Sequence, residues 1–151
     1  MKKYELTEET KEISGVRLHR IRALCDFGDV KSGDLGGWIE GEYNLNHDGD
    51  AWVRGNAWVS GDATVNGNAV VRGNAWVTNK NDYLNIYPIG SQDDSVTFYR
   101  LKDGGLGVSC GCFTGTLNDF IEAVAEEHGD NQHGKEYMAA VELAKVRFGV
   151  D

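Results

Sequence analysis

The sequence predicts a mainly β fold in which stacked, repeating coils precede a C-terminal hairpin and two helices. Three observations predict it. The chain has 20 glycines but 1 proline among 151 residues, which indicates many turns built in one repeated way. A six-residue repeat runs through residues 49–78, and such a short fixed period is typical of a solenoid. Beyond residue 115, apolar residues recur at helical spacing.

Size and charge limit the possible partners. A chain of 151 residues forms one domain, or a core with a small appendage. Lys and Arg total 15 against 24 Asp and Glu, for a net charge of −9. We therefore expect neither duplex nucleic acid nor an anionic membrane as a partner. The N-terminal segment has no apolar stretch of the kind that a secretory signal needs, so we expect a cytoplasmic protein.

The repeat consists of five consecutive hexads. Each reads Gly, Asp or Asn, Ala, a variable residue, Val and a second variable residue: GDAWVR, GNAWVS, GDATVN, GNAVVR and GNAWVT. We expect Val to point inward and Ala to pack at a corner. The Gly–Asn and Gly–Asp pairs suit turns that need a positive φ. Turn formation also explains the Asp and Asn without a calcium site. Three hexads would close one triangular coil.

A second spacing of 18 residues relates hexads that are three apart. Trp58 matches Trp76, and Arg54 matches Arg72, so these pairs should stack on adjacent coils. Here the chain resembles the hexapeptide-repeat left-handed parallel β-helix, which winds about 18 residues per coil. The resemblance extends more weakly to residues 36–39 and 83–86. Leu45 lies eight residues before Val53, which indicates a two-residue insertion.

The flanking segments provide caps for the two open ends of the coils. The sequence predicts strands over 4–6, 15–24, 95–101 and 106–110, with a turn over 102–105. Thr116 and Asp119 have capping-box spacing and predict a helix over 117–128 that Gly129 ends. A second helix is predicted over about 135–148, ended by Gly149. The expected parts are an N-terminal cap (1–35), the repeat (36–88) and a C-terminal ββαα module (89–151).

The layout of the whole chain resembles a group of small phage and prophage proteins. The most specific shared pieces are GDLGGWIE, at residues 33–40, and SCGCFTGTL, at residues 109–117. The resemblance implies a phage origin and a bacterial host cytoplasm, and it implies no particular chemistry. Phage proteins of this size often act on host defences, and some of them sequester small nucleotide signals in pockets between protomers.

Arginine and aromatic side chains are the candidates for holding such a ligand. Arginine forks suit phosphates and aromatic faces suit bases. We predict no catalytic residues, no metal and no cofactor. The candidate ligand-binding residues are Arg17, His19, Arg20, Arg22, Trp38, Arg54, Arg72, Tyr99 and Arg100. For each arginine the alternative is a solvated side chain paired with one of the many acids.

Three further features leave alternatives open. Trp52, Trp58 and Trp76 occupy a position that should point outward, so we expect them to be buried under the helical tail or in an oligomer interface. The alternatives are a scaffold surface for a protein partner, or stacking of Trp58 or Trp76 on a ligand. The β-helix resemblance implies a possible acyltransferase with a His general base, for which His47 and His19 are the nearest residues. Cys110 and Cys112 could ligate zinc only if His128 and His133 completed the site, because no second cysteine pair exists.

These observations favour a non-enzymatic, homo-oligomeric binding protein, a dimer or trimer, whose ligand is a small phosphate-bearing nucleotide. The interaction scaffold and the acyltransferase are the two alternatives. The odd cysteine count argues against a disulfide framework.

Overall fold

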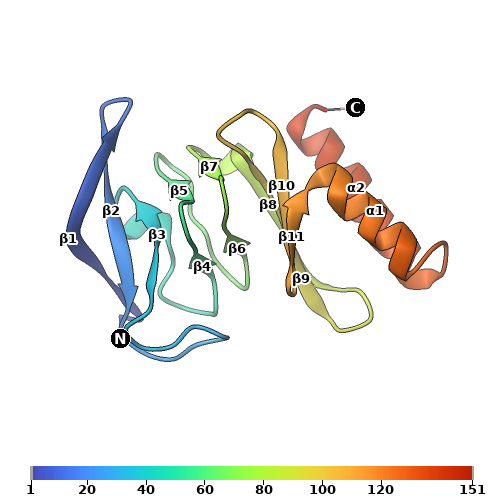
Figure 1. The fold of residues 1–151 in the computed structure, drawn as a ribbon, viewed down its shortest axis with the longest axis horizontal. Coiled ribbons are helices and arrows are strands. Elements are labelled where there is room, and N and C mark those ends of the chain that lie inside the picture. The colour runs from blue at the N-terminus through green and yellow to red at the C-terminus, as the bar shows by residue number, and fades with distance from the viewer. Residues whose placement is uncertain (1, 151) are drawn as a thin grey trace.

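The computed structural model describes residues 2–150 as a mainly β protein with two C-terminal helices (Figure 1). The strands are β1 (Tyr4–Ile13), β2 (Val16–Ala23), β3 (Leu35–Ile39), β4 (Trp52–Val53), β5 (Trp58–Val59), β6 (Val70–Val71), β7 (Trp76–Val77), β8 (Tyr83–Ile89), β9 (Asp94–Arg100), β10 (Leu106–Cys110) and β11 (Phe113–Thr116). The helices are α1 (Leu117–Glu127) and α2 (Gln132–Phe148), and short 3₁₀ turns span Glu42–Asn44 and Lys80–Asp82. Between residues 2 and 150, neither helix has the length and apolar composition needed to cross a bilayer.

The hexads form short parallel ladders with the predicted spacing. Trp58 on β5 pairs with Trp76 on β7, and Trp52 on β4 pairs with Val70 on β6, each 18 residues apart. An isolated parallel bridge joins Leu45 to Val65, where the predicted two-residue insertion lengthens the spacing to 20. The prediction that residues 18 apart stack on one another is therefore confirmed.

Each hexad turns at its glycine and buries its alanine and valine. The hexad glycines have positive φ values between 59° and 75°: Gly49, Gly55, Gly61, Gly67 and Gly73. The hexad alanines and the inward valines of the repeat are fully buried. Because only glycine adopts this conformation without strain, the glycine sets where each turn falls.

Trp52 is covered, as expected, with only 2% exposed, but the cover comes from the N-terminal part of the chain and not from the helical tail. The rings of Phe27 and Tyr4 pack edge-on against it, with centroids 5.2 and 6.3 Å away. A Cβ added at Gly36 would lie 2.7 Å from the indole. This glycine of β3 therefore makes room for a tryptophan that the N-terminal cap covers.

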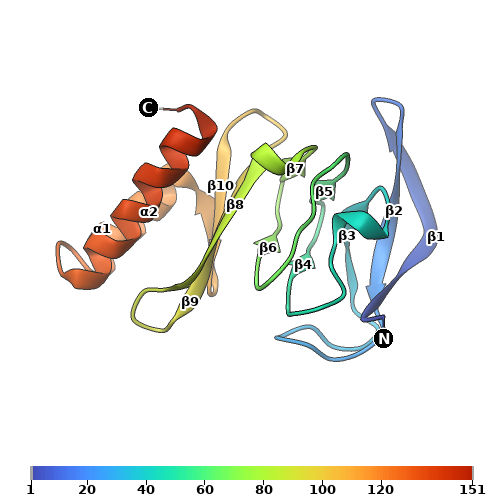
Figure 2. The ribbon, with the colours of Figure 1, turned by 180° about the vertical axis from the view of Figure 1, so that it is seen from behind.

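The N-terminal cap is a β-hairpin that continues one ladder of the repeat. β1 and β2 pair antiparallel, β2 pairs antiparallel with β3, and β3 pairs parallel with β5. The resulting sheet has the order β1-β2-β3-β5-β7 (Figure 2). β1 is longer than the predicted strand over 4–6. The hairpin thus covers the open end of the first coil.

The C-terminal part is an antiparallel sheet of order β11-β10-β9-β8. β8 pairs with β9 from Tyr83 onward, so the weak extension of the repeat to residues 83–86 is wrong, and the boundary drawn at residue 88 falls within β8. Thr116 caps α1 with a capping box to Asp119, and Gly149 ends α2 in the left-handed conformation, as predicted.

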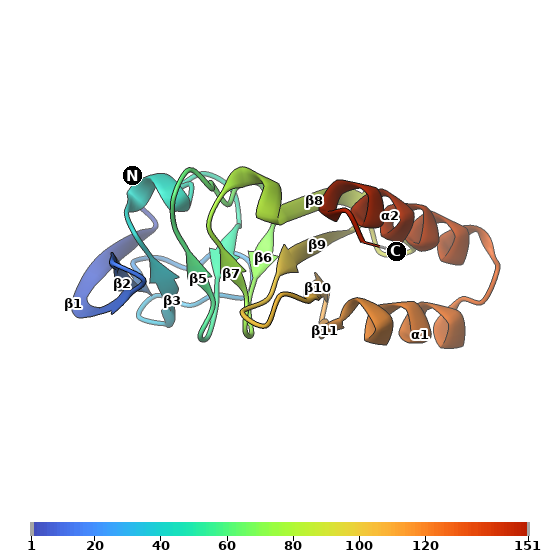
Figure 3. The ribbon, with the colours of Figure 1, turned by 90° about the horizontal axis from the view of Figure 1, so that it is seen from above.

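Two hydrophobic cores share strand β9. Val96 and Phe98 belong to the core under α1 and α2, whereas Tyr99 belongs to the core of the repeat. Thr97, between them, accepts a hydrogen bond from the amide of Val70 in β6. The C-terminal sheet therefore lies between the repeat and the helices (Figure 3), and alternate side chains of one strand serve each side.

Candidate functional site

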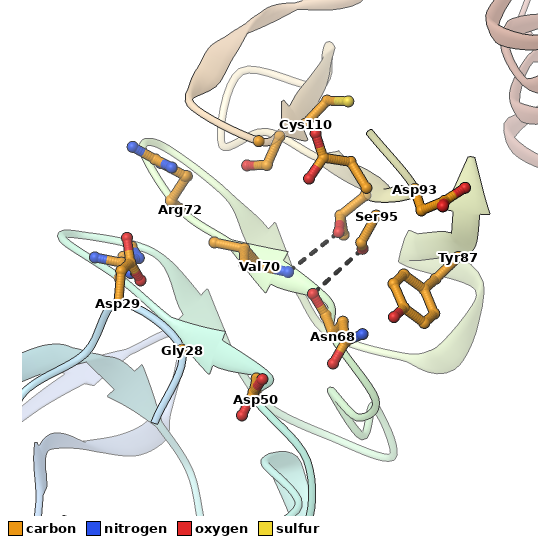
Figure 4. Close-up of a pocket in the computed structure, with 15 residues that line it drawn as sticks. Gly28, Asp29, Asp50, Asn68, Val70, Arg72, Tyr87, Asp93, Ser95 and Cys110 are labelled. Atoms are coloured by element: carbon orange, nitrogen blue, oxygen red, sulfur yellow. Dashed lines mark hydrogen bonds and ion pairs between the residues drawn. The ribbon is translucent and has the colours of Figure 1, made fainter. Parts of the chain in front are cut away.

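A cleft of about 330 Å³ lies between the repeat and the C-terminal sheet (Figure 4). One side comes from the loop before β3 and from two coils of the repeat, and the other from β8, β9 and the β10–β11 turn. The lining residues are Gly28, Asp29, Asp50, Arg54, Asn68, Val70, Arg72, Tyr87, Asp93, Asp94, Ser95, Thr97, Ser109, Cys110 and Gly111.

The stacking of hexads brings Arg54 and Arg72 to this cleft. They follow the valines that pair in the ladder, Val53 and Val71, and so leave adjacent coils on the same side. Arg54 forms an ion pair with Asp29, while its Nε is buried and has no hydrogen-bond partner. Arg72 is half-buried, and within residues 2–150 it forms no hydrogen bond or ion pair. Arg72 is therefore the cation of the cleft that is available to a ligand.

Carboxylates outnumber arginines around the cleft. Asp29, Asp50, Asp93 and Asp94 all line it, and Asp29 is engaged by Arg54. The carboxylates of the other three have no hydrogen-bond donor or salt-bridge partner among the described residues. A ligand that fits this charge pattern combines an anionic group with hydroxyl or amino donors, because a bare anion gains from Arg72 but is repelled by the aspartates.

Hydrogen bonds fix the floor of the cleft. Ser95 donates from its Oγ to the carbonyl of Asn68 over 3.2 Å, and the amide of Val70 donates to Thr97 Oγ1 over 3.1 Å (Figure 4). Both hydroxyl oxygens also lie within hydrogen-bond distance of Asn85 Oδ1, at 2.7 and 2.8 Å. The bonds to Asn68 and Val70 join the repeat to the C-terminal sheet, so the two sides of the cleft are held at a fixed separation.

The other predicted basic residues lie away from the cleft. Arg17, Arg20 and Arg22 lie on β2, where they pair with Glu12, Glu9 and Glu5 of β1. His19 also lies on β2, and it does not line the cleft. Hairpin pairing places Glu12 opposite Arg17 and Glu5 opposite Arg22, while Glu9 reaches Arg20 from the irregular stretch of β1. This is the arrangement expected for solvated charge pairs.

Three further predicted residues have other partners. The ring of Trp38 is 6% exposed and lies under Lys11 Nζ and the Arg20 guanidinium, at 4.0 and 5.5 Å from the ring centroid. Tyr99 is 1% exposed, shares a hydrogen bond with Ser109, and has a pKa raised by burial. Arg100 donates to the carbonyl of Phe148 in α2. None of these three lines the cleft, and the burial of Tyr99 leaves no ring face for a base.

The sequence interpretation missed Tyr87, whose ring is the aromatic group at the cleft and is 55% exposed. The signal that could have found it is the period-two alternation of β8. Asn85 and Tyr87 are two residues apart and therefore share a face, and Asn85 contacts Ser95 of the cleft. Residues 83–86 were assigned to the repeat instead, which hid this alternation.

The Trp face of the repeat is partly covered by lysines. Trp58 and Trp76 are half-buried and pack edge to face with centroids 5.6 Å apart. Lys102 Nζ lies 3.7 Å from the Trp58 ring centroid and Lys11 Nζ lies 5.4 Å from it. Burial and the neighbouring Lys11 lower the pKa of Lys102. This face is thus less apolar than three outward tryptophans would make it.

Neither the zinc site nor a histidine base is assembled. Residues 2–150 contain no group of three His, Cys, Asp or Glu side chains placed to hold a metal ion. Burial raises the pKa of the Cys110 thiol to about 11. His47 accepts from the amide of Lys3 at Nδ1 and contacts Glu42 Oε1 through Nε2 over 2.8 Å. With Nδ1 accepting, Nε2 carries the proton, so neither nitrogen is free to take a proton from a substrate.

No protein-family model matches the chain. A comparison with curated proteins found a segment that is 39% identical over 61 residues to a protein of Escherichia coli (strain K12) described as the uncharacterized acetyltransferase YdcK. The match covers 35% of this chain and 19% of that protein. The chain therefore spans about a fifth of the length of this relative, and the similarity concerns one segment of each.

Proposed function

We propose that this chain is a phage-type, non-enzymatic binding protein that sequesters a small phosphate-bearing nucleotide signal of host defence. The observation that carries the proposal is the composition of the cleft: Arg72, without a protein partner in the described part of the chain, lines the same space of about 330 Å³ as four carboxylates and the exposed ring of Tyr87. Arginine suits the phosphate, carboxylates suit sugar hydroxyls and base amino groups, and a tyrosine ring suits a base.

The proposal includes the architecture that supports the cleft. The parallel ladders with 18-residue spacing support a short left-handed parallel β-helix. The resemblance to phage proteins supports action in the cytoplasm of a bacterial host. A stack of so few coils gains stability from self-association. The exposed apolar side chains on α2, Leu143 and Val146, support a homo-oligomer.

The test is thermal unfolding in the presence of cyclic, diphosphate and ADP-ribose-type nucleotides. A ligand at 100 times its Kd adds about 2.7 kcal/mol of stability, which raises the melting temperature by a few degrees. We expect Arg72→Gln to abolish this shift and Arg17→Gln, a control on the distant hairpin, to keep it. The nucleotide should be recovered intact. Recovery of a cleaved product would make the protein an enzyme, and the absence of any shift would overturn the proposal.

The partial similarity to an acetyltransferase favours acyl transfer as a second candidate. It requires a general base, and His47 would first have to release the amide of Lys3. Acetyl transfer from acetyl-coenzyme A to a panel of amines and hydroxyls measures this directly. Activity that is lost in His47→Ala or His19→Ala would establish the enzyme.

A further inference from the structure

A second pocket, of about 400 Å³, lies on the helical side of the C-terminal sheet. It is formed by the β8–β9 connection, the β10–β11 turn and one face of α1, with α2 behind. Its lining residues are Ser91, Gln92, Asp94, Cys110, Gly111, Cys112, Phe113, Phe120, Ala123, Val124, Glu127, His128 and Tyr137. No arginine or lysine contributes to it, so its chemistry differs from that of the first cleft.

Aromatic rings line much of the second pocket. Phe113 packs against Phe120 with centroids 5.4 Å apart, and His128 stacks on Tyr137 with centroids 5.5 Å apart and planes 30° from parallel. Flat faces of this kind contact other flat, conjugated rings favourably. Glu127 and Gln92 add hydrogen-bonding side chains at the edge. The pocket therefore suits a nitrogen heterocycle better than an alkyl chain.

The two pockets share Asp94, Cys110 and Gly111, at one end of the sheet. Gly111 has φ +57°, and a Cβ there would lie 3.0 Å from Asp94 Oδ2. The glycine thus leaves space beside a carboxylate that has no hydrogen bond or ion pair to other described side chains. Burial raises the pKa of the Cys110 thiol to about 11, and Asp94 supplies the carboxylate that both pockets share.

We propose that the two pockets form one composite site that binds a nucleoside phosphate, with the base beside the half-buried rings of Phe113 and His128, the ribose hydroxyls on Asp94 and the phosphate on Arg72. The order of the three environments matches the covalent order of base, sugar and phosphate. This inference rests on the proposed function and extends it, since it adds the ribose contact and moves the base from the ring of Tyr87 to the second pocket.

The base pocket is tested by filling it. Ala123 is half-buried on α1 and lines the pocket, whereas Ala125 is exposed on the same helix and does not. We expect Ala123→Phe to weaken ADP binding at least tenfold, measured by calorimetry, and to leave ribose 5-phosphate binding unchanged. Ala125→Phe is the matched control and should bind both as the unmodified protein does. Melting curves of the two variants confirm that each is folded.

A variant of Asp94 tests the ribose contact, because it should change the affinities for ADP and pyrophosphate in opposite directions. Asp94→Asn keeps the shape but removes the charge and one strong acceptor. We expect it to weaken ADP binding several-fold while strengthening pyrophosphate binding, because the repulsion between carboxylate and phosphate is lost. If both probes bind more tightly to Asp94→Asn, Asp94 acts only through its charge and the ribose contact is refuted.

Failure of the inference and failure of the proposed function give different results. Equal affinity for ADP and ribose 5-phosphate, both insensitive to Ala123→Phe, would overturn the base pocket while the phosphate site stands. Adenosine binding that is sensitive to Ala123→Phe and gains nothing from a phosphate would overturn the proposed function instead. If none of ADP, ADP-ribose, a cyclic nucleotide and adenosine binds, both are wrong.

Discussion

Hexad glycines share one backbone conformation but differ in what lies around them. Gly61 has φ +66°, and a Cβ there would lie 2.0 Å from the carbonyl oxygen of Thr78 in the next coil. Gly55 has φ +59°, and a Cβ there would meet nothing within 4 Å. The two positions therefore separate the cost of the conformation from the cost of close stacking between coils.

We predict that Gly55→Ala destabilises the protein by about 1–2 kcal/mol, the cost of a left-handed conformation for an L residue. Gly61→Ala should cost at least about 1 kcal/mol more, because the methyl group displaces the next coil. Urea unfolding of the two variants measures the difference. Equal losses of unfolding free energy would show that the next coil can move away at Thr78 without cost.

Lys3, in the N-terminal cap, has a buried side-chain amine. Its Nζ donates to the carbonyls of Ala51 and Gly49 over 2.7 and 3.1 Å. Burial lowers the pKa of Lys3 to about 8, from an ordinary value of 10.5. Between these two values the unfolded chain holds a proton at Lys3 that the folded chain has released.

Stability should therefore rise with pH through this window. We predict that the free energy of unfolding of the unmodified protein, minus that of Lys3→Met, increases from pH 8 to pH 10.5 by about 3 kcal/mol at most. The difference should be constant below pH 8. Urea unfolding at a series of pH values checks it, and a difference that falls with pH would show that the ammonium form is favoured in the folded protein.

At the element scale, local chemistry decides where α1 begins. Thr116 accepts from the amide of Asp119, and the Asp119 side chain accepts from the amide of Thr116, each over 3.1 Å. We predict that Thr116→Ala costs about 1 kcal/mol of unfolding free energy. Thr114→Ala, at an exposed β11 position, is the control and should cost less. Equal losses would mean that packing, not the cap, holds the start of α1.

Local patterns were enough to predict most elements. The glycine positions and the 18-residue spacing follow from repetition, and the ends of both helices follow from caps and glycines. The residues that cover Trp52 could not be predicted, because Tyr4 and Phe27 come from another part of the chain. The same holds for the site: hexad spacing predicts that Arg54 and Arg72 converge, whereas the contribution of Tyr87 depends on how β8 pairs.

The pairing of the β2 arginines with glutamates of β1 also depends on the fold and not on the sequence pattern alone. Arg17, Arg20 and Arg22 form a conspicuous basic group in the sequence, but the register of β1 against β2 places glutamates beside them. The order of charges in the sequence does not show which residues of β1 and β2 lie beside each other. Only the fold distinguishes Arg72, without a partner in residues 2–150, from the arginines that form ion pairs with carboxylates.

At the scale of the whole molecule, α2 is the place where self-association is expected. Leu143 is 51% exposed and Val146 is 80% exposed, and their spacing of three residues places them on the same side of the helix. An exposed apolar stripe of this kind is typical of an interface. The stripe lies at the end of the molecule opposite the N-terminal hairpin (Figure 3).

We predict that the double variant Leu143→Glu, Val146→Glu converts the oligomer to a protomer of 16.6 kDa, because like charges would meet across the interface. Light scattering coupled to size exclusion measures the mass. Ala125→Glu, on the exposed face of α1, should leave the oligomer intact. A mass of one protomer for the unmodified chain would refute self-association, and an unchanged oligomer in the double variant would place the interface elsewhere.

The two ends of the chain meet across the middle of the repeat. Lys11 of β1 and Lys102, which follows β9, lie over the ring of Trp58, 5.4 and 3.7 Å from its centroid. β9 also contacts the last coils, through the Thr97–Val70 bond and the Ala75–Leu101 bridge. The number of repeats is therefore fixed by both ends. An added 18-residue period would keep their relative orientation but move the two lysines apart, and an insertion of any other size would also rotate one end against the other.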